Sequence, residues 1–205
     1  MNNRQKILTA LTDRQVPDVS LPDLQRDWTT YPDPKAQFVE VLEGVGGKAL
    51  EVSGSDSIGA GLQRVEAYRE AKNICSTVSG IPSTGEEWSG LKDPHEFETL
   101  ECCVVPGEFA VAENAAVWLT DKSIPCRAAL FVTQHLVLVV PSSGILQNMH
   151  EAYAKISFDD VRFGIFVSGP SKTADIEQSL VIGAHGARSL TVVLVVGQPT
   201  EMGPG

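Results

Sequence analysis

The sequence predicts an α/β protein in which helices and a mixed β-sheet form three layers. Strand-like apolar segments alternate with helical segments of about 10–15 residues, the order typical of a three-layer α/β fold. The stretch Leu190–Val196 is apolar with almost no alternation, as expected for a strand buried on both faces of a parallel sheet. The hairpin-like region 109–140 indicates some antiparallel pairing in addition.

Composition limits the class of protein. The 205 residues suit one domain with an appended arm, and 42% hydrophobic against 20% charged residues is a globular composition. The formal net charge is −10 without any run of Lys or Arg, which disfavours nucleic acid and anionic membranes as partners. The polar start does not resemble a signal peptide, and the longest apolar stretch, 128–141, is too short for a membrane span. We therefore expect a cytoplasmic protein.

The N-terminal residues 1–32 are expected to form an arm, and residues 33–205 the domain. Residues 1–12 have the apolar spacing of a short amphipathic helix. Four prolines between positions 13 and 34 then leave no room for a regular element, so this part is expected to be extended. Trp28 and Tyr31 are its expected anchors on the body or on a partner.

Local signals define the elements of the domain in chain order. A helix is expected to begin at Asp33-Pro34, because proline is favoured in the first turn, and to end at Gly46-Gly47. The 3.6-residue period predicts a second helix over 57–71. We expect β-structure at 48–53, 73–78, 102–105, 109–119, 127–140, 162–168 and 190–196, and further helices opening at Asp93-Pro94 and over 144–156 and 171–183.

The four cysteines are expected to be small buried apolar residues. Cys102 and Cys103 are adjacent, and on a strand they point to opposite faces and rarely bond each other. The sequence has no CxxC, so a zinc or iron–sulfur site within this chain is not expected. The other two are Cys75 and Cys126.

The strongest local signal is a strand, a tight turn and a helix start over 162–177. Gly169 permits a tight turn, and Asp175 with Gln178 has the offset of a capping box. One interpretation is a well-capped helix. The other is an anion site, because ligands of open α/β sheets sit beyond the carboxyl ends of strands, where a helix N-terminus offers free N–H groups. Lys172 would add positive charge.

The segment 168–178, Ser-Gly-Pro-Ser-Lys-Thr-Ala-Asp-Ile-Glu-Gln, followed by Gly-Ala-His-Gly at 183–186, resembles the signature of the LutC/YkgG family, the LUD domain of bacterial lactate utilisation proteins. A weaker resemblance extends from about Asp33 to Val196. The resemblance to the LutC/YkgG family implies a Rossmann-like fold similar to the NagB/RpiA/CoA-transferase superfamily. It also implies a component that supports oxidation of L-lactate to pyruvate, with iron–sulfur clusters in partner subunits and no cofactor in this chain.

The resemblance implies a small anionic ligand at the 168–177 turn. The ligand-binding residues expected from it are Ser168, Gly169, Pro170, Ser171, Thr173, Asp175, His185 and Gly186. No metal site is expected. His185 has a second interpretation, in which it bonds the last carbonyls of the expected helix. His135, inside an apolar strand, is expected to be a hydrogen-bonded core residue rather than a ligand.

The chain departs from the family pattern after Ala112-Glu113. A small or hydroxyl residue, then Gly, then Thr or Ser is usual there, whereas this chain has Asn114-Ala115-Ala116. Proline usually follows His-Gly, and here Ala187 stands instead. An alternative function is kept open, although the loss of Gly-Thr after Glu113 counts against it. This alternative is a free-standing CoA-transferase-like or methenyltetrahydrofolate-synthetase-like enzyme using Glu113 as nucleophile. A third possible function is that of a non-catalytic binding module. The oligomeric state is also left open, and a homo-oligomer is one possibility.

Overall fold

The larger of two main sheets is parallel throughout. The computed structural model describes residues 2–12, 19–20, 22–23, 26–85, 88, 93–124, 126–174, 180–183 and 185–197. The strands of this sheet follow the order β1-β11-β6-β3-β2, all in one direction. They are β1 Lys48–Ser53, β2 Ile74–Ser76, β3 Cys102–Pro106, β6 His135–Pro141 and β11 Ser189–Val196.

The antiparallel pairing lies in a separate four-stranded sheet with the order β7-β4-β5-β8. Its strands are β4 Phe109–Val111, β5 Ala116–Thr120, β7 Ile145–Leu146 and β8 Gly164–Val167. β5 pairs antiparallel with β4 and β8, whereas β4 and β7 run parallel. The strand expected over 109–119 is thus two strands joined by a turn, and the second sheet, not the first, is mixed.

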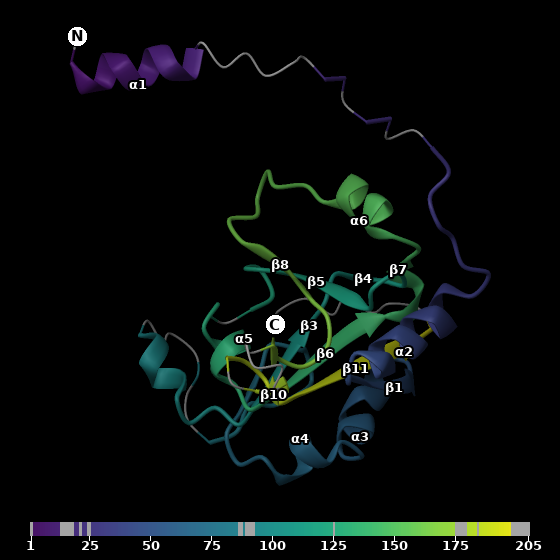
Figure 1. The fold of residues 1–205 in the computed structure, drawn as a ribbon. Helices are drawn as coiled ribbons and strands as arrows, with labels where there is room; N and C mark the ends of the chain where they lie inside the picture. The colour runs from purple at the N-terminus through teal and green to yellow at the C-terminus, as the bar shows by residue number, and fades with distance from the viewer. Residues whose placement is uncertain are drawn as a thin grey trace.

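The layers are visible in Figure 1. The short helices α3 Ile58–Leu62 and α4 Glu66–Glu70 lie on one side of the parallel sheet, and the second sheet lies on the other. The second-sheet side also carries helices α2 Pro34–Gly44 and α5 Ala129–Val132, while α6 Met149–Lys155 packs on the outer face of the second sheet. The expected three-layer α/β arrangement is therefore confirmed, with one outer layer made partly of strands.

Strand β11 shows why the central sheet forms. Leu190 and Leu194 belong to the core cluster on the second-sheet side, and Val193 and Val195 to the cluster on the helix side. Each such side chain contributes about 1.5–3 kcal/mol when it is fully buried. The unbroken apolar run therefore matches a strand covered on both faces, as predicted.

Adjacent cysteines divide between the two core clusters in the same way. Cys102 faces the helix side and Cys103 the second-sheet side, as the alternation along β3 requires. Burial raises the pKa of the Cys102 thiol to about 12, so this thiol is protonated at neutral pH and packs as an apolar group. Cys75 is buried as well, whereas Cys126 is half-buried.

The helix expected over 57–71 is two short helices with a break between them. Gly61 lets α3 approach β1 closely, because a Cβ at this position would lie 2.6 Å from Val52 Cγ1. Glycine also has a low helix propensity, which favours an early end. Val65, in extended backbone with φ −86° and ψ 107°, then precedes α4. The contact with β1 thus interrupts the helix, although the 3.6-residue period of apolar residues continues through the break in the sequence.

Two further segments differ from the sequence prediction. The β-structure expected over 127–140 begins with helix α5, whose Ala-Leu-Phe-Val sequence fits either type of element, and the strand starts only at His135. The helix expected over 144–156 begins late, at Met149. Asn148 caps it by accepting a hydrogen bond from the Glu151 N–H at 3.0 Å.

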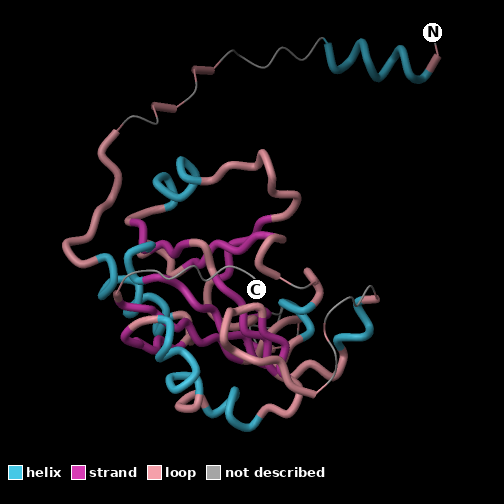
Figure 2. The backbone as a smooth tube through the Cα atoms, turned by 180° about the vertical axis from the view of Figure 1, so that it is seen from behind, coloured by secondary structure: helices cyan, strands magenta, loops and turns pink. Residues whose placement is uncertain are grey.

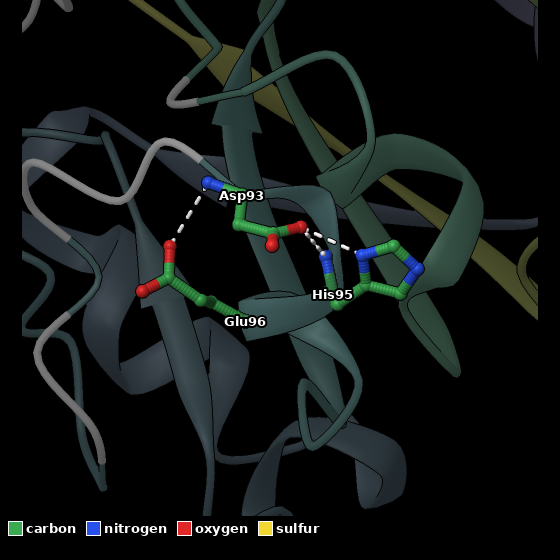
Figure 3. Close-up of polar contacts among 3 residues, drawn as sticks. All are labelled: Asp93, His95 and Glu96. Atoms are coloured by element: carbon green, nitrogen blue, oxygen red, sulfur yellow. Dashed lines mark hydrogen bonds and ion pairs between the residues drawn. The ribbon is translucent and has the colours of Figure 1, made fainter.

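The turn at Asp93-Pro94 opens a helix as predicted, in 3-10 form, η2 Pro94–Phe97 (Figure 3). Asp93 accepts from the His95 N–H at 3.0 Å and donates its own N–H to Glu96, a capping box. The Asp93 carboxylate also lies 2.7 Å from His95 Nδ1. This contact raises the pKa of His95, whose side chain is highly exposed.

The N-terminal helix α1 Asn3–Thr12 forms as predicted and lies apart from the rest of the molecule, with no buried residue (Figure 2). The arm is fixed to the body near α6. The Trp28 ring stacks on His150 with centroids 3.4 Å apart, and the Tyr31 N–H donates to Gln147 Oε1 at 2.7 Å. Both predicted anchors are confirmed. No helix in the described part of the chain is long and apolar enough to cross a membrane.

Candidate functional site

The segment after β8 forms a hairpin where the sequence predicted a helix. β9 Lys172–Ala174 pairs antiparallel with β10 Leu180–Ile182, so the helix expected over 171–183 is wrong at these residues. Thr173, Val181 and Ile182 are β-branched, which favours strands and restricts side-chain rotamers in helices. Asp175, expected to cap the helix and contact the ligand, lies outside the described residues.

The hairpin changes the basis of the predicted anion site. The Ser171 N–H donates to the Ala187 carbonyl at 2.9 Å, and the Ser171 carbonyl accepts from the Gly183 N–H at 3.0 Å. The following strand is paired with β10. No helix dipole or row of free helical N–H groups is therefore available at 171–174, and an anion here would have to be held by side chains.

Gly169 fixes the turn between β8 and the hairpin. Its φ is +70°, and a Cβ at this position would lie 2.9 Å from both the carbonyl oxygen and Cγ2 of Val45. The backbone conformation and the close approach to the α2–β1 turn both require glycine. The predicted turn is thus confirmed, and it packs on the body.

Six of the predicted ligand-binding residues line one cavity of about 300 Å³, here called the signature cavity. They are Ser168, Gly169, Pro170, Ser171, His185 and Gly186. Lys172 joins them in the lining. Thr173 follows in β9, and Glu113 is not among the described lining residues.

The signature cavity lies at the amino edge of the parallel sheet. Leu136 and Leu190, at the starts of β6 and β11, line it together with Val167 at the end of β8. The sequence places the expected site beyond the carboxyl end of the strand at 162–168. The turn does follow the carboxyl end of a strand, but β8 belongs to the second sheet.

The rim of the signature cavity is polar and carries positive charge. The Ser168 hydroxyl donates to the Asn114 carbonyl at 2.7 Å. Lys172 and His185 are exposed, and within the described chain no carboxylate lies within ion-pair distance of the Lys172 ammonium. A carboxylate or phosphate entering the cavity would therefore meet a cation that no carboxylate of the described residues pairs with.

The floor of the signature cavity was not foreseen from the sequence. Leu130, Leu136 and Leu190 are all at most 4% exposed and come from three different elements. In the sequence they are indistinguishable from ordinary core residues, because only the packing of β8 and α5 against the sheet creates a space between them. No local signal could have identified this apolar part of the site.

The Ala112–Ala116 turn borders the signature cavity through Ser168. The Glu113 carboxylate accepts the Met149 N–H at 2.8 Å, at the first residue of α6. Ala115 has φ +53°, the left-handed conformation that the glycine usual in the family adopts without strain. A left-handed residue thus stands in this turn although the glycine is absent.

A second hollow of about 490 Å³ lies on the helix side of the same sheet edge. Lys48, Arg64, Glu66 and Glu70 contribute charges of both signs to its lining. At its floor, His135 Nδ1 lies 2.8 Å from Ser189 Oγ, which confirms His135 as a hydrogen-bonded residue. Burial, and secondarily the Arg188 charge, lowers the pKa of this imidazole. We call this space the helix-side hollow.

Comparisons with known proteins identify related chains. Residues 87–195, just over half of the chain, match the LUD domain. A lactate utilization protein C from Geobacillus thermodenitrificans is 30% identical over 171 residues, covering 71% of each chain. One from Bacillus velezensis is 29% identical over 126 residues, and the match spans 51% of its length.

A solved structure supports the fold. The crystal structure of a DUF162 family protein from Deinococcus radiodurans superimposes with a TM-score of 0.59 at 20% sequence identity. The superposition covers 80% of this chain and 96% of that one. At this level of identity the likeness shows the α/β architecture alone.

Proposed function

The chain belongs to the LUD domain family, and from that premise we propose that it is a cytoplasmic lactate utilisation component that binds a small organic anion in the signature cavity. In this role it supports oxidation of L-lactate to pyruvate together with partner subunits that carry iron–sulfur clusters. The relatives named lactate utilization protein C support the role. This chain needs no cofactor of its own in that arrangement.

One observation carries the ligand part of the proposal. Two separated segments of the sequence signature, 168–172 and 185–186, line the same cavity. A packing role alone does not require that an exposed lysine and an exposed histidine share one rim. Lys172 supplies the charge and the Ser171 hydroxyl can donate a hydrogen bond, and these two groups replace the helix dipole expected from the sequence.

The partner surface is proposed to include the N-terminal arm. Helix α1 exposes Ile7, Leu8 and Leu11, each at least 47% accessible, along an otherwise polar helix. A short helix gains most of its stability from tertiary packing, so α1 has an apolar face available for another protein. Trp28 holds the base of the arm on α6.

The role is tested by deleting the gene in its host and measuring growth on L-lactate as sole carbon source. Growth should fail and return when the full chain is supplied. Affinity-tagged full chain should also recover iron–sulfur subunits, and a variant lacking residues 2–12 should recover less. Normal growth of the deletion strain, with no subunit recovered by the full chain, would reject the role.

A further inference from the structure

The signature cavity is divided into an apolar depth and a polar rim. Its buried floor is made by Leu130, Leu136 and Leu190, and Phe131, half exposed, stands at its edge. The polar groups, Ser168 and Lys172, are exposed. A ligand bound by its carboxylate at the rim would therefore direct the rest of its body onto apolar side chains.

The volume is generous for a three-carbon acid. About 300 Å³ corresponds to roughly ten water molecules and to the lower end of pockets that take drug-sized ligands. Lactate presents only one methyl group to an apolar floor. A longer side chain would displace water from the accessible apolar side chains of the lining, Phe131, Ile165 and Val167. It would gain about 0.8 kcal/mol per buried methylene, or about fourfold in affinity.

The hydrogen bond of Ser168 selects the group beside the carboxylate. Its hydroxyl hydrogen is directed to the Asn114 carbonyl at 2.7 Å. A hydroxyl has one hydrogen and two lone pairs, so Ser168 is left as an acceptor toward the cavity. A hydroxyl group on the ligand can donate to it, whereas a keto oxygen cannot.

Resting on the proposed function, we infer that the signature cavity takes α-hydroxy monocarboxylates with apolar side chains larger than that of lactate, and prefers them to the corresponding α-keto acids. Lactate, with a single methyl group as its side chain, binds more weakly than these longer acids. The carboxylate is held by Lys172 and the hydroxyl donates to Ser168 Oγ. The side chain covers Phe131, Ile165 and Val167, behind which the leucines lie.

The test is calorimetric titration of the full chain with lactate, α-hydroxybutyrate, α-hydroxyisocaproate and phenyllactate, each paired with its α-keto acid. We expect affinity to rise about fourfold for each added methylene. Each hydroxy acid should bind roughly fivefold more tightly than its keto partner, the value of one neutral hydrogen bond. Lactate binding more tightly than every longer acid would overturn the inference and leave the proposed function standing.

Two variants separate the two parts of the inference. Ser168→Ala should abolish the preference for hydroxy over keto acids and keep the preference for longer side chains. Phe131→Ala should weaken phenyllactate roughly threefold to tenfold and lactate little. Phe158→Ala is the matched control, because Phe158 is also exposed but lies against Trp118 of the second sheet. A hydroxy-acid preference unchanged in Ser168→Ala would contradict the assignment of Ser168.

The absence of any binding to the signature cavity would have a different consequence. If neither lactate nor any longer acid bound the full chain, the inference and the ligand part of the proposed function would both be overturned. The growth and partner-recovery experiment would still decide the lactate role independently, because it does not depend on a ligand in this cavity.

Discussion

Two spaces lie on opposite faces of the parallel sheet at the same edge, and neighbouring residues of the same strands line them. Leu136 and Leu190 line the signature cavity, whereas His135 and Ser189 line the helix-side hollow. Because successive side chains of a strand point to opposite faces, one residue of offset separates an apolar floor from a polar one.

The difference in charge between the two spaces suggests which one receives an anion. In the helix-side hollow, Lys48 and Arg64 share the lining with Glu66 and Glu70, and the His135–Ser189 contact satisfies the polar floor. The smaller signature cavity has a cation at its rim with no carboxylate in the described lining. The charge of the described lining therefore favours an anion in the signature cavity, although the helix-side hollow has the larger volume.

The largest expected effect concerns the wall of the signature cavity. Gly169→Ala should lower the free energy of unfolding by about 3 kcal/mol, since it combines a left-handed backbone with a contact to Val45 that is too short. Gly54 has φ +83° but nothing within 4 Å of an added Cβ, so Gly54→Ala should cost only about 1 kcal/mol. Urea denaturation measures both. Equal costs would show that the Val45 contact does not hold the turn.

Charge reversal tests the assignment of the anion to one space. Lys172→Glu should weaken binding of α-hydroxyisocaproate by about thirtyfold, equivalent to about 2 kcal/mol, because a carboxylate would face a carboxylate. Lys48→Glu makes the same change in the helix-side hollow and should alter affinity less than about twofold. The reverse order of the two effects in a titration would move the site to the other face of the sheet.

The pH dependence of stability sharpens the description of the helix-side hollow. The pKa of His135 is lowered in the folded state from 6.5, so its neutral form contributes stability above pH 6.5. That contribution is lost as the pH falls through the folded-state pKa. The free energy of unfolding should therefore decline less steeply below pH 6.5 in His135→Asn than in the unsubstituted protein, as measured by urea denaturation at several pH values. Parallel curves would show that His135 is not desolvated.

The smallest effect is expected at the turn that departs from the family pattern. Ala115→Gly relieves a left-handed conformation worth about 1–2 kcal/mol but removes a fully buried methyl group worth about 0.8 kcal/mol. The net result should be a gain of about 0.5 kcal/mol in thermal or urea denaturation, with ligand affinity unchanged. A loss of stability would mean that packing of the methyl group outweighs the backbone strain.

The parts of the fold that sequence predicted well are those whose signal is local. The unbroken apolar run of β11, the adjacent cysteines of β3 and the proline-marked start of α2 each reflect the environment of one element. The hairpin of β9 and β10 was missed because the segment carries a helix-capping pattern, which competes with the strand preference of its β-branched residues.

The candidate site also has one part with a local sequence signal and one part without such a signal. The polar rim was predicted from the signature over 168–186, and the structure brings most of those residues together. The floor depends on where Leu130, Leu136 and Leu190 meet in space, which no periodicity in the sequence encodes. The role of Ser168 as an acceptor depends likewise on a contact with Asn114, 54 positions away in the chain.

The most direct test of the central claim is an NMR titration of the isotopically labelled full chain with α-hydroxyisocaproate. The account predicts that backbone amide resonances at 168–172 and 185–187 shift together and saturate with one affinity. It also predicts that the amides of Lys48, Arg64 and Thr191, which line the helix-side hollow, stay in place. Movement confined to the helix-side hollow, or no movement at 168–172, would contradict it.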